Sequence, residues 1–123
     1  VESEVPPVIK EKMVAANSSQ TTRSRSRTGK HSRQLVSPWT QAWESEQAPD
    51  PLPTPLQPMV AEPALQKVAK LAEGGHDGAR DLATYWVGQG VGLMNQSISA
   101  SDVVQEFKED FVEAYERLTG FVS

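Results

Sequence analysis

Apolar residues recur at helical spacing in several parts of the chain, most clearly near its C-terminal end. There, Ser99 and Asp102 stand at the spacing of a capping box ahead of a long periodic run. We expect this helix to end before Gly120, with Phe121 folding back on Leu118. Within its stripe, Phe107 and Phe111 should anchor the helix against an apolar surface. The stripe consists of Val103, Val104, Phe107, Phe111, Ala114, Tyr115 and Leu118.

Shorter helices are predicted upstream of this one. Prolines at positions 6 and 7 precede the run 8–17, which indicates a short helix that ends near Asn17. Ser37 as cap and Pro38 at the first helical position predict a second short helix, which ends near Gln47.

Two further helices are expected after the middle of the chain. Pro63 is suited to open the first of them, and the glycines at 74–75 are suited to end it. Asp77 then restarts a helical pattern, which we follow as far as Trp86.

The remaining stretches do not favour helix. Polar and basic residues alternate from 18 to 31, which predicts an exposed strand or loop. Proline stands at nearly every second position in 48–58 and favours a stiff polyproline II connector. We therefore predict a mainly α fold of four to five helices with a short extended basic segment and a proline-rich connector. The expected division is 1–47, 48–58 and 59–123.

Composition limits the classes of protein that this chain can represent. The 123 residues fit one domain at most, and only 37% are hydrophobic, so the core must come from a few helices. The absence of cysteine excludes disulfides and thiolate sites and makes a reducing cytoplasm the default location. No apolar run is long enough to span a bilayer, so we expect no membrane association. Because the sequence does not begin with methionine, we expect a fragment or a processed product.

Charge is distributed unevenly along the chain. Residues 23–33 hold five bases and no acid, whereas six acids face two bases from Ser99 onward. The basic run fits a phosphate-bearing cofactor or an acidic neighbouring surface. It is short and lacks interleaved aromatic residues, so we do not expect nucleic-acid binding.

The residue pattern does not indicate a complete catalytic site. His31 and His76 are far apart and lack partners at metal-ligand spacing, so we interpret them as exposed loop residues and expect no metal site. No serine lies in a nucleophile elbow, and we assign no catalytic residue. The glycine cluster at 88–92 lacks the full dinucleotide fingerprint and suits a tight bend or close packing.

Four segments, in this order, resemble the C-terminal part of nitronate monooxygenases, also called 2-nitropropane dioxygenases. The resemblance covers nearly the whole chain, although Lys30 stands where that family usually has arginine and Ser37-Pro38 interrupts a region that is usually a longer helix. The segments are SEVPPVIKEKMVAA (3–16), TTRSRSRTGKHSR (21–33), PLPTPLQ (51–57) and YWVGQGVGL (85–93).

The resemblance implies an FMN-dependent (β/α)8 barrel flavoprotein, with this chain as its C-terminal subdomain. The histidine base and the turns that hold the FMN phosphate belong to the barrel in that family, so FMN is expected in the intact enzyme and not on this chain alone. The implied partners are this barrel, in cis or in trans, and a small nitronate-type substrate. Contact with the cofactor would fall to Trp86, Gly88, Gln89 and Gly90, unless this segment only packs against the barrel. The alternative is a non-enzymatic helical module that binds a protein partner through its basic segment or apolar helix face.

Overall fold

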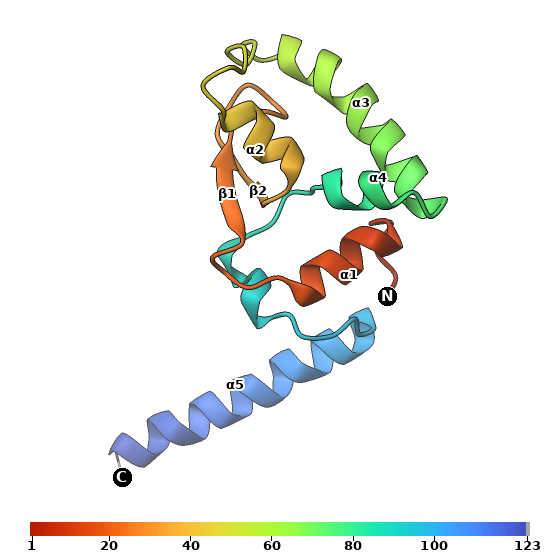
Figure 1. Ribbon diagram of the computed structural model, residues 1–123. Coiled ribbons are helices and arrows are strands. Elements are labelled where there is room, and N and C mark those ends of the chain that lie inside the picture. The colour runs from red at the N-terminus through yellow and green to blue at the C-terminus, as the bar shows by residue number, and fades with distance from the viewer. Residues whose placement is uncertain (123) are drawn as a thin grey trace. The chain divides into compact units, whose positions relative to one another are not determined.

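The chain forms five α-helices, one short 3-10 helix and a two-stranded hairpin in the computed structural model, which describes residues 1–122 (Figure 1). This confirms the mainly α prediction. The chain divides into two compact units. One unit spans Val5–Asn95, and the other combines Val1–Glu4 with the residues from Gln96 onward. The predicted division at 48–58 stays a prediction, because these units describe packing and not independent folding.

The larger unit has a small apolar core between three helices. These are α1 (Pro7–Ala15), α3 (Leu56–Glu73) and α4 (Asp77–Leu82). Val8 packs there with Ala72 and Ala79, and Val68 lies against the cluster. The small side chains Ala72 on α3 and Ala79 on α4 let these two helices approach closely.

The basic segment forms an antiparallel hairpin, because its period-two pattern suits paired strands. Strand β1 (Thr21–Ser24) pairs with β2 (Ser32–Leu35), and Thr21 lies opposite Leu35. The expectation that this segment is exposed was wrong in part. Ser24, Ser26 and Arg27 are buried, because the turn of the hairpin lies beneath other parts of the unit.

Helix α2 (Pro38–Glu44) begins as predicted. Ser37 precedes it with an extended backbone, and Thr40 forms the half of a capping box that reaches back to Ser37, whose own hydroxyl makes no hydrogen bond with another described residue. The Ser37 amide donates to the Thr40 hydroxyl over 3.0 Å. Trp39 and Trp43, which share a face, lie with ring centroids 6.2 Å apart.

Helix α3 begins earlier than predicted. Its first residue is Leu56, so Pro63 lies inside it and does not open it. Pro58 is tolerated because its missing N–H belongs to the first turn, where amides have no intrahelical partner. Pro63 interrupts the helix interior, where burial of Ala61 and Leu65 stabilises the helix against this loss.

Helix α4 ends at Leu82 and does not continue to Trp86 as expected. Residues 85–87 instead lie alongside β2. The Leu35 amide donates to the Tyr85 carbonyl over 3.0 Å, and the Val87 amide donates to the Arg33 carbonyl over 3.1 Å. The aromatic pair is therefore held in extended backbone, close to the hairpin.

The second unit consists mainly of helix α5 (Ala100–Val122). The predicted capping residues are confirmed, since the Asp102 amide donates to the Ser99 hydroxyl over 3.1 Å. The Ala100 amide donates to the Glu2 carboxylate over 2.9 Å, and this bond lowers the pKa of Glu2.

Two expectations for α5 were wrong. The helix continues through Gly120, and Phe121 is 86% exposed and does not fold back on Leu118. Because the helix continues, Phe121 lies on the same exposed face as Leu118 and the rest of the apolar stripe. None of the described residues of α5 is buried, so Phe107 and Phe111 have no apolar surface to pack on within their own unit. None of the described helices is long and apolar enough to cross a membrane.

Candidate functional site

Hydrogen bonds fix the turn of the hairpin to the start of α3. The Gln57 side-chain amide donates to the Ser26 carbonyl over 2.7 Å and accepts from the Leu52 amide over 3.0 Å. The Thr54 hydroxyl donates to the Thr28 carbonyl. Gln57 and Ser26 have no exposed surface, so the bond between them forms away from water. Together, these bonds fix the position of the residue between them in the turn, Arg27.

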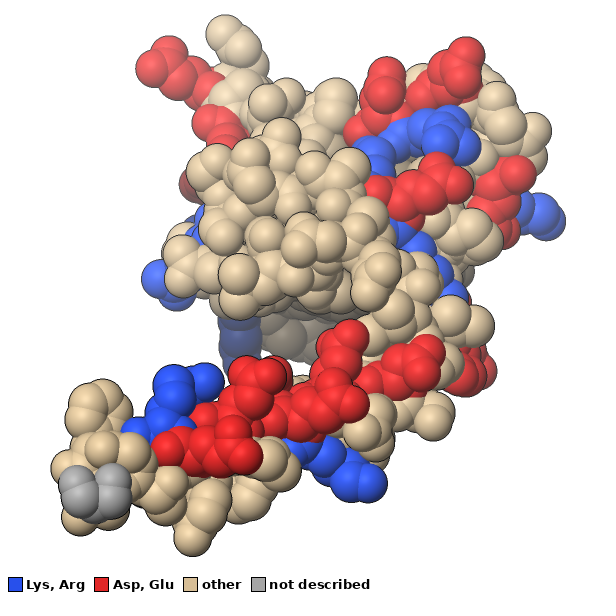
Figure 2. Space-filling view, turned by 90° about the horizontal axis from the view of Figure 1, so that it is seen from below, with Lys and Arg blue, Asp and Glu red and all other residues tan. Residues whose placement is uncertain are grey.

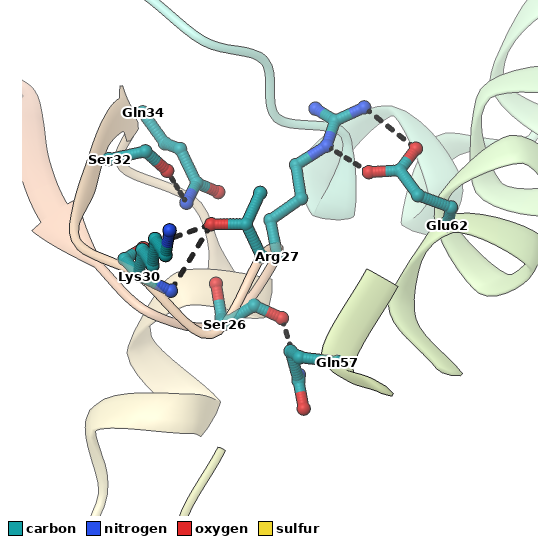
Figure 3. Close-up of polar contacts among 8 residues, drawn as sticks. Ser26, Arg27, Lys30, Ser32, Gln34, Gln57 and Glu62 are labelled. Carbon is teal, nitrogen blue, oxygen red and sulfur yellow. Dashed lines mark hydrogen bonds and ion pairs between the residues drawn. The ribbon is translucent and has the colours of Figure 1, made fainter. Parts of the chain in front are cut away.

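Arg27 is the central side chain of the candidate site. Its Nε and Nη2 atoms donate to the two carboxylate oxygens of Glu62 on α3, over 2.6 and 3.2 Å (Figure 3). Only 8% of the Arg27 side chain is exposed, against 29% for Glu62. A bidentate pair of this kind fixes the plane of the guanidinium group, because both donors point at one carboxylate.

The guanidinium group also stacks on the first predicted site residue. Its central carbon lies 3.6 Å from the centroid of the Trp86 ring and 5.4 Å from that of Tyr85. The two rings meet edge to face with centroids 5.7 Å apart. Cation–π attraction and the backbone pairing with β2 therefore position Trp86 from two sides. Its ring remains 41% exposed.

The next three predicted residues lie at the start of the 3-10 helix η1 (Gln89–Leu93). Val91 is 2% exposed and anchors the turn. A Cβ added at Gly92 would lie 2.5 Å from the Ser18 hydroxyl, so this glycine is required for packing. Val91 and Gly92 therefore hold the 3-10 helix in place.

Gly88 and Gly90 are different, because the space beside them is open. A Cβ added at Gly90 would meet nothing within 4 Å, and at Gly88 only the Gly90 amide nitrogen at 3.9 Å. Gln89 between them is exposed. We define the presenting segment as Trp86 to Gly90. The four predicted site residues, which are neighbours in the sequence, are exposed in this segment, and Gln89 offers an amide side chain able to donate and accept hydrogen bonds.

A hollow of about 210 Å³ lies beside the Arg27–Glu62 pair and is also lined by Tyr85. This volume is below the range of roughly 300 to 1,000 Å³ that small-molecule sites occupy. The hollow is therefore too small to enclose a cofactor the size of a flavin. Beside the Arg27–Glu62 pair, the arrangement therefore suits a supporting edge of a site better than a complete pocket.

The two histidines lie as the sequence predicts. Both are exposed, and His76 additionally caps α4, because its Nδ1 atom accepts from the Ala79 amide over 3.2 Å. Among residues 1–122, no group of acidic or histidine side chains is arranged to hold a metal ion.

Sequence reasoning missed the roles of Arg27 and Glu62. The charge pattern places Arg27 in the basic segment that we expected to be exposed, and it gives no prediction for Glu62. A signal for Glu62 does exist, since it lies three residues before the buried Leu65 and so shares the inner side of α3. No comparable signal marks Arg27 among its neighbouring arginines.

Comparison with known proteins identifies the family of this chain. The chain is 45% identical over 122 residues to a Mycobacterium tuberculosis protein named "Putative monooxygenase Rv1533". The match covers 98% of this chain and 32% of that protein, so the chain spans about a third of the length of its relative. No solved structure matches the chain. A sequence model described as nitronate monooxygenase matches residues 1–110, which is most of the chain, and the chain therefore belongs to the nitronate monooxygenase family.

Proposed function

We propose that this chain is the C-terminal portion of an FMN-dependent oxidoreductase that acts on nitronate-type substrates. The family membership and the match to a third of a longer monooxygenase support this proposal. A flavin-binding barrel, in cis or in trans, completes the enzyme. When bound, FMN would accept electrons from the substrate and pass them to oxygen. The base that removes the proton from the carbon next to the nitrogen group belongs to the barrel.

The observation that carries the role of this chain is the openness of the presenting segment. Gly88 and Gly90 leave their backbone accessible, and neither glycine is needed for packing among the described residues. A planar ring system can approach such backbone closely. Gln89 would bind a polar edge of the cofactor or substrate, and Trp86 would offer a face or edge to it.

The Arg27–Glu62 pair contacts the presenting segment through the ring of Trp86. Arg27 is stacked on Trp86, bound to Glu62 and only 8% exposed, and its remaining Nη1 atom is buried as well. We therefore assign to Arg27 a positioning role. Arg27 fixes the orientation of Trp86. The position of Trp86 in turn determines the position of the backbone of Gly88 and Gln89, which follow it in the chain.

Substitution of Gln89 tests the proposal in the enzyme that contains both the barrel and this chain. We expect Gln89→Ala to lower nitronate turnover or substrate affinity while leaving the melting temperature unchanged, because Gln89 is exposed. Gln41→Ala is the matched control, since Gln41 is an exposed glutamine on α2. Steady-state oxygen consumption and flavin content are the measurements. Wild-type turnover, affinity and flavin content in Gln89→Ala would reduce the role of this chain to support.

The chain alone should bind FMN weakly. In this family the turns that hold the FMN phosphate belong to the barrel, and attraction by exposed arginines is sensitive to salt. Titration of FMN followed by its fluorescence measures this. Stoichiometric binding that resists salt would contradict a cofactor site completed by the barrel.

A further inference from the structure

Helix α5 carries an apolar face that no part of the described chain buries. Phe111 is 71% exposed, Phe107 is 68% exposed and Leu118 is 61% exposed. The match to the family model stops at residue 110, so Phe111 and Leu118 lie beyond the matched residues. The proposed function does not use it.

The apolar residues of α5 follow a heptad repeat. Successive spacings alternate between three and four residues, which places these side chains at the a and d positions of a coiled coil. Val104, Phe111 and Leu118 take the a positions, and Phe107, Ala114 and Phe121 take the d positions. We call these six residues the seam.

The charged residues of α5 are distributed unevenly around the seam. Five of the six acids take the outer b, c or f positions, and Figure 2 shows acidic side chains gathered along one side of α5. The charged residues beside the seam are Asp110 and Arg117 at g positions and Lys108 at an e position. Residues at e and g positions select the partner of a coiled coil and its orientation.

This arrangement is complementary to itself in one orientation. In a parallel pair, a g residue faces an e residue of the other helix, so Asp110 would face Tyr115 and Arg117 would face Val122. No ion pair forms. In an antiparallel pair, g residues face each other, so Asp110 faces Arg117 of the second copy, and the contact occurs twice by symmetry. Arg117 can reach it, since its own ion pair with Glu113 is long, at 3.8 Å, and exposed.

The seam also fits this antiparallel register. Val104 then lies in a layer with Phe121 of the second copy, and Phe107 lies with Leu118. Phe111, a large residue, lies with Ala114, a small one. Alternation of large and small residues across facing positions fills the layers without voids.

We propose that α5 is a self-association element, through which two copies of this chain pair by an antiparallel coiled coil along the seam. The observations behind the proposal are the exposed heptad face, the outward placement of the acids and the reciprocal match of Asp110 with Arg117. The partner is a second copy, because the charges that flank the seam complement each other.

The first test measures the mass of the 123-residue chain by sedimentation equilibrium. We expect the mass to rise from 13.5 kDa toward twice that value as concentration increases over a range of about 1 to 500 µM. A chain that stays monomeric throughout would overturn the proposal.

Two matched substitutions then locate the interface. Phe111→Glu places a charge in the seam and should raise the dimer dissociation constant at least about tenfold. Val112→Glu adds the same charge at an exposed b position, one residue away, and should leave the constant unchanged. The far-ultraviolet circular dichroism of each variant reports whether its helices, α5 included, remain formed. If both substitutions change the dimer dissociation constant equally, or if Phe111→Glu leaves it unchanged, the seam is not the dimer interface.

Charge reversal tests the orientation. Asp110→Arg and Arg117→Asp, each alone, should weaken self-association by about three- to tenfold, because each places like charges opposite each other. An equimolar mixture of the two variants should pair as tightly as the wild type, since every contact is then between opposite charges. If the mixture remains as weak as either variant, the antiparallel register is wrong.

Discussion

The bidentate pair of Arg27 with Glu62 can be tested by removing one charge and keeping the shape. Glu62→Gln leaves the Arg27 guanidinium buried with one acceptor oxygen in place of two. Loss of one partner costs about 3 to 5 kcal/mol when both charges are fully buried. Glu62 is 29% exposed, so water reaches one side of the pair. We therefore expect a smaller loss of unfolding free energy, of about 2 to 3 kcal/mol.

A loss of this size is readily measured. For a domain of roughly 100 residues, each kcal/mol lowers the melting temperature by about 4 to 8 °C, so Glu62→Gln should melt about 10 to 20 °C lower. Glu11→Gln is the matched control. It breaks the pair of Glu11 with Arg80, in which the side chains are 64% and 44% exposed. An exposed pair contributes less than about 1 kcal/mol.

The result that would refute this reasoning is equal melting of Glu62→Gln and Glu11→Gln. A double variant, Arg27→Met with Glu62→Gln, adds a second check. Once the guanidinium group is removed, the Glu62 substitution should cost much less than it does in the wild type. Additive losses would mean that the two side chains contribute independently.

Two further predictions concern backbone geometry and pH. Gly29→Ala should lower the unfolding free energy by about 2 kcal/mol or more, since Gly29 has a φ of +78° and a Cβ there would lie 2.3 Å from the Leu52 carbonyl oxygen. Gly75→Ala, with a φ of +88° and open space, isolates the backbone strain and should cost about 1 kcal/mol in urea denaturation; equal losses would exclude the clash as the cause. Lys12 donates to the carbonyls of Asp81 and Ala83, and its partial burial lowers its pKa. Between its folded and unfolded pKa values the unfolded chain binds more protons, so the stability of the wild type relative to Lys12→Met should rise with pH toward the ordinary lysine pKa; a fall in that difference would contradict the assignment.

Local signals in the sequence predicted much of the fold. The caps at Ser37 and Ser99 and the apolar spacing of α3 depend on residues near each other in the chain, and all three helices form, with α2 and α5 beginning where expected. The failures have tertiary causes. Pro63 is compatible with a helix interior because Ala61 and Leu65 are buried beside it. Residues 85–87 leave the helical pattern because β2 offers them backbone partners.

The candidate site shows the same division. The glycines and Gln89 were identified from a segment that resembles a family motif, and the structure places them together on accessible backbone. The role of Arg27 depends on contacts with Glu62 and Trp86, which lie 35 and 59 positions away in the sequence. No local pattern distinguishes it from Arg25, whose side chain donates to the nearby Gly29 carbonyl.

The interior around the hairpin has a thermal consequence. Its largest fully buried side chains are polar, namely Gln34, Gln57, Thr40 and Ser26. Exposure of polar surface on unfolding lowers the heat capacity, whereas exposure of apolar surface raises it. We therefore expect this unit to unfold with a smaller heat capacity change than a unit of the same length with a wholly apolar interior. A smaller heat capacity change flattens the stability curve, so cooling should lower the unfolding free energy less steeply.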